Sequence, residues 1–269
     1  MKNKLKKDEG FVQYAFCIML FAICSLIILY SLRMRIVQQQ KQYIEDGITN
    51  SALASATIDL NEYGTYNYVR SGSNNFWDEE EDRYLKNFKD ALKINLNLDN
   101  NLYPNESNTI ITSQVRIVNY WIYSKEVQDY IDENGHYVLI RDYNANWVRQ
   151  HYQTDNWYVL KYQANLDANG ITTGTCAYSR EFLGDGVIKT PADTNIITSD
   201  AGGGKFGIDG AGSGEIEVDG LTIYATLQFE VNPFGYNDHD TYTDGIFGVG
   251  SLVSDTTITK SVVVAIREK

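Results

Sequence analysis

The side chains of this chain best suited to chemistry by type and spacing lie in a short polar segment near the C-terminus. Asp238, Asp240 and Asp244 surround His239, and their carboxylates could offer oxygen ligands to a calcium ion. The spacing differs from that of an EF-hand loop, because the segment lacks the central glycine and the terminal glutamate. The sequence therefore favours a solvated acidic loop over Asp238–Asp244, and calcium binding there stays open.

A second group of side chains that could bind a ligand is aromatic. Its members are Trp147, His151, Tyr152, Trp157 and Tyr158. If these rings were exposed, they could stack on sugars or on a partner surface, and if buried they would form the core around a strand. Aromatic residues dominate the energetics of protein cores, so the sequence favours the second interpretation.

Other chemistry finds little support in the sequence. The three histidines, His136, His151 and His239, show no metal-binding spacing, and no Gly-x-Ser-x-Gly motif is present. The glycine-rich stretch Asp200–Gly220 lacks the Gly-Lys-Ser/Thr and the helix that follow a phosphate-binding loop. We therefore predict no catalytic residue, no cofactor and no metal site, and we expect that the chain is not an enzyme.

Charge and cysteine content limit the classes of partner. The net charge is −12, and after Arg35 the chain carries 17 basic and 33 acidic residues. Such an acidic surface repels phosphate backbones, so nucleic acid is not an expected partner. Cys17 and Cys24 lie in an apolar segment, and Cys176 is alone in the rest of the chain, so no internal disulfide is expected there.

The apolar segment, residues 11–32, predicts a transmembrane helix. It contains no charged residue, and at about 1.5 Å per residue it is long enough for a hydrocarbon core about 30 Å thick. Residues 1–10 form a leader with four lysines, which favours a cytoplasmic N-terminus and a C-terminal domain outside the cell membrane. The sequence thus predicts a single-pass protein that has the lipid bilayer as one partner.

The junction of leader and apolar segment resembles the class III leader of type IV pilins and pseudopilins. It reads Lys-Lys-Asp-Glu-Gly-Phe-Val-Gln-Tyr-Ala from Lys6, and Val-Gln-Tyr-Ala is similar to the core motif of TadE-like minor pseudopilins. The resemblance implies that a prepilin peptidase cuts between Gly10 and Phe11. It also implies that Gln13 and Tyr14 pack against neighbouring helices. Those families have a glutamate in place of Gln13, at the fifth position after the glycine instead of the third, so a minor component fits better than a major filament subunit.

Residues 33–64 predict a helical stalk that continues the membrane helix to about residue 61, with Gly64 near its end. Small residues cluster in this stretch, as in TadE-like proteins, and Ile44, Ile48, Ser51 and Ser55 follow helical spacing. The resemblance implies that Ser51, Ala52 and Ser55 pack on similar helices of other subunits.

Residues 65–269 predict a β-rich extracellular domain of the α+β class, an antiparallel sheet or sandwich with one packed helix. Tyr84, Leu85, Phe88 and Leu92 give that helix an apolar face. β-branched and aromatic runs predict strands. They cover residues 115–123, 137–142, 157–164, 221–231 and 256–267, with a weaker candidate at 173–178. Val127, Tyr130 and Ile131 suggest a short helical turn.

Three functional hypotheses follow. The first is a minor pilin or pseudopilin-like structural component of a Tad-like or type IV pilus or secretion apparatus. Its partners would be other pilin-like subunits or secretion-system membrane proteins. The alternative is a signal-anchored extracytoplasmic binding protein, which an exposed aromatic surface would favour. A membrane-tethered enzyme is the least favoured, because no catalytic constellation is visible in the sequence.

Overall fold

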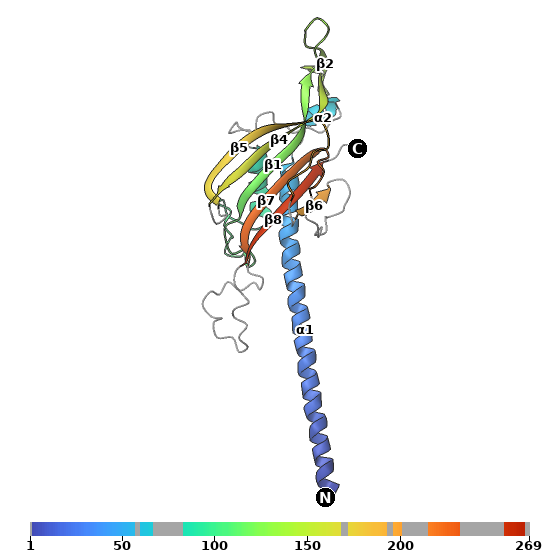
Figure 1. Cartoon of the computed structure of the whole chain (residues 1–269), viewed down its shortest axis with the longest axis vertical. Coiled ribbons are helices and arrows are strands. Elements are labelled where there is room, and N and C mark those ends of the chain that lie inside the picture. The colour runs from blue at the N-terminus through green and yellow to red at the C-terminus, as the bar shows by residue number, and fades with distance from the viewer. Residues whose placement is uncertain are drawn as a thin grey trace.

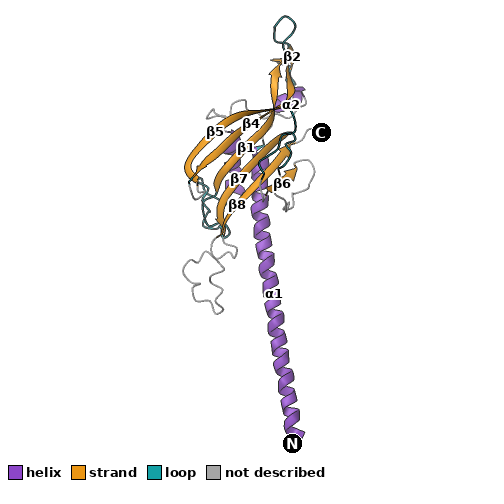
Figure 2. Cartoon of the chain, in the orientation of Figure 1, coloured by secondary structure: helices purple, strands orange, loops and turns teal. Residues whose placement is uncertain are grey.

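The computed structural model contains a long N-terminal helix and a β-rich C-terminal part (Figures 1 and 2). It describes residues 2–56, 60–66, 83–167, 172–192, 196–200, 215–231 and 256–266. The elements are α1 (Lys2–Ser55), α2 (Leu60–Tyr66), α3 (Arg83–Asn95), β1 (Arg116–Asp129), β2 (Leu139–Arg141), β3 (Trp147–Arg149), β4 (His151–Leu166), β5 (Thr172–Gly184), β6 (Ile196–Asp200), β7 (Leu221–Val231) and β8 (Thr256–Ile266). The Asp238–Asp244 loop lies outside the described residues.

One six-stranded sheet forms the body of the C-terminal part, in the order β5-β4-β1-β7-β8-β6. Neighbouring strands are antiparallel, except that β6 runs parallel to β8 at one edge. The bounds of β7 are those that its β-branched and aromatic run predicts. The expectation of an antiparallel sheet is thus confirmed for five strands, and a separate two-stranded sheet joins β2 to β3.

Two helices cover one face of the sheet, where one packed helix was expected. The C-terminal part of α1 packs against α3 and β8, and α1 passes behind the sheet in Figure 1. The predicted apolar face of α3 is confirmed, since Tyr84, Leu85, Phe88 and Leu92 are all buried. They form one core with Ile44, Ile48 and Ala52 of α1 and with the inward-facing residues of β1, β4, β7 and β8. The ring of Phe88 lies 4.9 Å from that of Tyr120 on β1.

The small residues of α1 let this helix approach α3 and β1 closely. The Ser51 hydroxyl donates to the Gly47 carbonyl (2.6 Å) and accepts from the Asn95 side-chain amide (3.0 Å). The Tyr120 hydroxyl donates to Ser55 Oγ (2.8 Å). Each of these buried hydroxyls has a partner, so α1 is fixed in register against the domain without a desolvation penalty.

Gly47 marks the closest approach of α1 to α3. A Cβ atom built on Gly47 would lie 2.4 Å from Cδ2 of the fully buried Leu96. Gly→Ala in an exposed helix stabilises by about 1 kcal/mol, whereas overpacking a core costs about 1–3 kcal/mol. We expect Gly47→Ala to lower the free energy of unfolding by about 1 kcal/mol net, measured by denaturant unfolding in detergent. Asn50→Ala, at an exposed position of the same helix, is the control. A stabilised Gly47→Ala would show that Leu96 can move aside.

Several boundaries differ from those expected; β4 begins at His151 instead of residue 157, and β5 continues to Gly184 instead of residue 178. α1 ends at Ser55 instead of continuing to residue 61, and Gly64 lies within the separate α2. The Ser55 hydroxyl donates to the Ala52 carbonyl (2.7 Å), a side-chain bond that competes with the backbone ladder. The suggested helical turn at Val127–Ile131 was wrong. β1 continues to Asp129, because Val127, Gln128 and Asp129 pair with residues of β4 that are distant in sequence.

Candidate functional site

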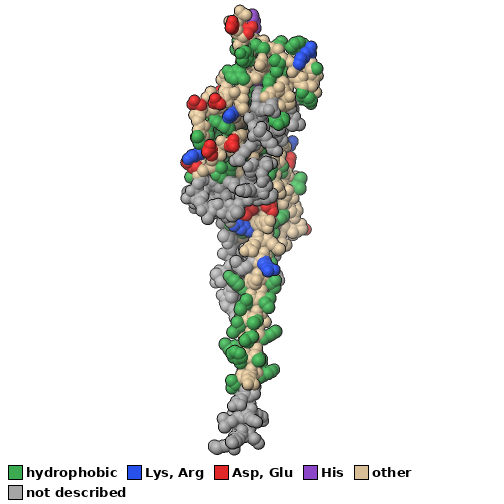
Figure 3. Space-filling model, turned by 90° about the vertical axis from the view of Figure 1, so that its right-hand side faces the viewer, with side chains coloured by type: hydrophobic (Ala, Val, Ile, Leu, Met, Phe, Trp, Pro, Cys, Tyr) green, Lys and Arg blue, Asp and Glu red, His purple; other side chains and the backbone are tan. Residues whose placement is uncertain are grey.

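The first functional feature is the exposed N-terminal part of α1. Its described large apolar side chains between Val12 and Ile36 are 46–74% exposed. Figure 3 shows these hydrophobic side chains around the projecting helix, with no other described part of the chain over them. Of the described helices, α1 is the one long and apolar enough to cross a membrane. A surface of this kind requires lipid or other apolar helices around it.

The residues expected to pack between helices fall into two groups. Gln13 and Tyr14 are exposed on the projecting part of α1, where another helix can reach them. Ser51, Ala52 and Ser55 are fully buried inside this chain, against α3 and β1. Ser51 contacts Asn95 of α3 and Ser55 contacts Tyr120 of β1, so all three buried residues pack within their own chain. They therefore present no surface to another subunit. Gly10 and Phe11 lie within α1, and their cleavage stays a prediction.

An ion pair adds to the attachment of α1 to the sheet. Lys260 Nζ of β8 lies 3.0 Å from Glu45 Oε1, and both side chains are less than one-fifth exposed. Lys41 Nζ lies 3.7 Å from the same carboxylate oxygen. The partly buried pair is screened less by salt than a surface pair. The pair lies where the exposed part of α1 meets the domain. It therefore links this part of α1 directly to β8.

The second feature is an arm at the end of the molecule away from the N-terminus (Figure 1). We define the arm as residues 130–150, which contain the β2–β3 hairpin. Leu139 pairs with Arg149 and Arg141 pairs with Trp147, so these four side chains share one face. Arg141 lies over the Trp147 ring at 4.1 Å, and Arg149 lies over the Tyr137 ring at 4.0 Å. The arm thus carries two stacked arginine–aromatic pairs in solvent.

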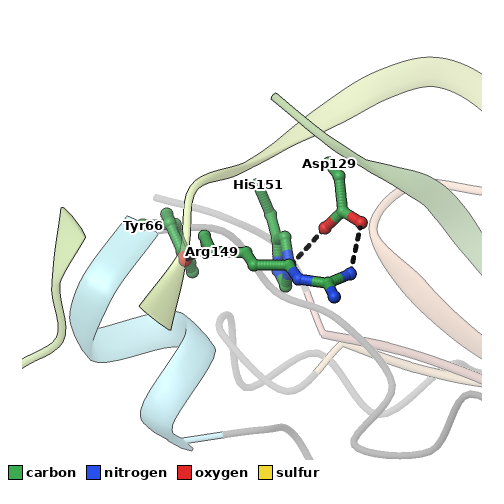
Figure 4. Close-up of polar contacts among 4 residues, drawn as sticks. All are labelled: Tyr66, Asp129, Arg149 and His151. Carbon is green, nitrogen blue, oxygen red and sulfur yellow. Dashed lines mark hydrogen bonds and ion pairs between the residues drawn. The ribbon is translucent and has the colours of Figure 1, made fainter. Parts of the chain in front are cut away.

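A polar cluster holds the base of the arm (Figure 4). The Asp129 carboxylate accepts from His151 Nε2 at 2.9 Å and from Arg149 Nη1 at 3.2 Å. The Tyr66 ring of α2 stacks on His151, with 5.6 Å between ring centroids, and the Tyr66 hydroxyl donates to the Arg149 carbonyl. Four residues from β1, β3, β4 and α2 thereby fix the direction in which the arm leaves the sheet. The same contacts explain His151 without a metal or catalytic role.

The aromatic cluster expected from the sequence is divided by the fold. Trp157 and Tyr158 of β4 are 7% and 4% exposed and belong to the core, as the sequence favoured. Trp147 and Tyr152 are 62% and 44% exposed, on the arm and at the start of β4. Tyr137, Arg141 and Arg149 were not predicted as functional residues from the sequence. The alternation of Tyr137, Leu139 and Arg141 and the turn after it were a signal that could have identified this face.

The face of the sheet opposite the helices carries a polar pocket of about 380 Å³. Lys125, Asp155, Trp157 and Glu217 are among its lining residues, and no metal-ligating cluster occurs in the parts of the chain that the structure describes. On the same face, burial raises the pKa of Tyr123, and nearby Tyr224 and Glu181 raise it further. The pocket brings no nucleophile and base together within its described lining, so it adds no catalytic site to the two features above.

Comparison of the chain with protein-family models, with curated proteins and with solved structures finds no match. The two features that bear on function are therefore the exposed apolar part of α1 and the arm.

Proposed function

We propose that this chain is a membrane-anchored, pilin-like structural component of a pilus or secretion apparatus. The observation that carries the proposal is α1. One unbroken helix exposes apolar side chains over its N-terminal part and buries its C-terminal part in the core of a sheet domain. A helix about 80 Å long is far longer than a bilayer requires. The additional length would hold the sheet domain at a fixed distance from the membrane. A subunit that packs against neighbours in an ordered assembly requires such a rigid connection.

In this proposal the N-terminus faces the cytoplasm and the sheet domain lies outside the cell. The lysine-rich leader favours that orientation by the positive-inside rule. Neighbouring subunits, or membrane proteins of the apparatus, would contact the exposed part of α1 through Gln13 and Tyr14. Gln13 can form a hydrogen bond within the bilayer but cannot neutralise a terminal amine, which suits a minor component.

The mature N-terminus tests the proposal. We expect mass spectrometry of the protein extracted from native membranes to show a chain that begins at Phe11. Gly10→Leu is the matched variant, and we expect it to keep the complete leader. An intact leader on the unmodified chain, in cells whose prepilin peptidase processes another substrate, would contradict the pilin-like assignment.

The arm favours a second candidate, an anchored binding protein outside the cytoplasm. Its Tyr137, Leu139 and Trp147 are exposed, so a ligand can reach them. A sheet domain with only a structural role would not need these apolar side chains on its surface. Deleting the exposed part of α1 separates the two candidates. If the chain is a pilin-like component, the deletion variant will no longer bind its assembly partners. If the chain is a binding protein, the variant will still bind its ligand.

A further inference from the structure

The arm face presents positive charge and apolar surface together. We define the arm face as Tyr137, Leu139, Arg141, Trp147 and Arg149. Its three apolar members are 49%, 53% and 62% exposed in chain order. Arginine, tryptophan and tyrosine are the residues most enriched at the energetic centres of protein interfaces. This composition, at the end of the molecule away from the N-terminus, indicates a contact surface.

Stacking prepares the two guanidinium groups for a ligand. Each lies about 4 Å from an aromatic ring, which restricts its rotation before any ligand binds. Arg141 donates to the Ala145 carbonyl and Arg149 donates to Asp129, each through Nη1. A guanidinium has five N–H donors in a planar fork, so both groups retain donors for a carboxylate, and Arg149 would share its charge between the ligand and Asp129.

The charge of the arm face selects the chemistry of the partner. The strands β2 and β3 contain two arginines and no acidic residue, although the chain as a whole carries a net charge of −12. The acidic side chains of the arm are Asp132, Glu133 and Asp142, all in its turns, and Asp132 and Asp142 accept bonds from backbone amides. An acidic ligand is therefore favoured at this face and disfavoured over most of the remaining surface.

The spacing of the arginines indicates an extended ligand. Arg149 is opposite Leu139, two residues before Arg141, so the two arginines are diagonal neighbours about 7–8 Å apart along the face. In an extended peptide, alternate side chains lie on one side at a spacing of about 7 Å. We propose that the arm face binds an extended acidic segment of a partner protein, with two carboxylates at alternate positions on Arg141 and Arg149.

The experiment uses the full chain in nanodiscs of neutral phosphatidylcholine and two labelled decapeptides of equal composition. One peptide has glutamates at alternate positions among serines, and the other has its glutamates in one block. Affinities are measured by fluorescence anisotropy at low and at physiological salt. We expect the alternating peptide to bind more tightly than the block peptide and to lose affinity as salt rises.

Variants assign the binding to the arm face. We expect Arg141→Gln to weaken binding about fivefold, the effect of losing one charge-assisted contact near the surface. Trp147→Ala should weaken binding about tenfold or more. Arg180→Gln is the matched control and should change nothing, since Arg180 also stacks on a ring, 4.4 Å from Tyr158, but lies on β5.

Three results would overturn the proposal. The first is no binding of either peptide. The second is equal binding of both peptides, or an equal loss in Arg141→Gln and Arg180→Gln, which would indicate unspecific attraction. The third is saturable binding of polygalacturonate with no binding of the alternating peptide, which would assign the arm face to acidic glycans. The assay does not depend on cleavage after Gly10, so its outcome is separate from that of the pilin-like assignment.

Discussion

Arginine at both Leu20 and Ile23 will remove the chain from the membrane. Both residues lie near the middle of the apolar segment and are 51% and 46% exposed. An arginine at the centre of a membrane helix costs about 3 kcal/mol, and two on neighbouring turns leave no uncharged stretch long enough to span the bilayer. We expect the double variant to move from the pellet to the supernatant when membranes are extracted at high pH.

The control for this experiment is Ile94→Arg. Ile94 lies on α3 and is 81% exposed, so an arginine there meets water whether or not α1 spans a membrane. We expect Ile94→Arg to remain in the membrane pellet. If the Leu20/Ile23 variant also remained there, the apolar part of α1 would not be what anchors the protein, and the membrane proposal would fail.

The sequence identified the elements whose signal is local. The uncharged apolar run of residues 11–32 predicted a long apolar helix, and α1 covers it. The spacing of Tyr84, Leu85, Phe88 and Leu92 identified the buried face of α3. β7 was also found with its correct bounds, since β-branched, aromatic and other apolar residues fill most of its length. In each case neighbouring residues in the sequence contain the whole pattern.

Features that depend on distant residues were not predicted. The extension of β1 to Asp129 requires pairing with β4, and α1 ends at Ser55 in contact with Tyr120, 65 residues away. β6 was missed because its partner is a parallel strand much later in the chain. The small residues of α1 gave no information about what they contact, and in the fold Ser51 contacts α3 while Ser55 contacts β1.

The candidate site was predicted in part for the same reason. The long apolar segment is a local property and was identified from composition, whereas the arm face requires the register of two strands. Trp147 was singled out as an aromatic residue, but only pairing with Arg141 shows that it carries a stacked guanidinium in solvent. Trp147 is exposed and Trp157 is buried, and this difference depends on the complete fold.

Phe88→Ala will destabilise the sheet domain strongly. Phe88 is fully buried at the contact of α3 with β1, against the ring of Tyr120. Truncating a buried phenylalanine costs about 3–5 kcal/mol, because burial is lost and a cavity remains. That cost is a large fraction of a typical domain stability of about 5–15 kcal/mol. We expect the melting temperature of the domain to fall by about 10 °C, measured by circular dichroism of the full chain in detergent.

Ile94→Ala tests whether that loss comes from the core or from the helix itself. It also truncates an apolar residue of α3, but at a position that is 81% exposed, and alanine favours helix. We expect its melting temperature to stay close to that of the unmodified chain. An equal fall in melting temperature in the two variants would mean that α3 contributes to stability through helix formation alone, and not through burial of Phe88. A loss confined to Phe88→Ala would show that α3 stabilises the sheet domain through its buried face, which packs in one core with the C-terminal part of α1 and the sheet.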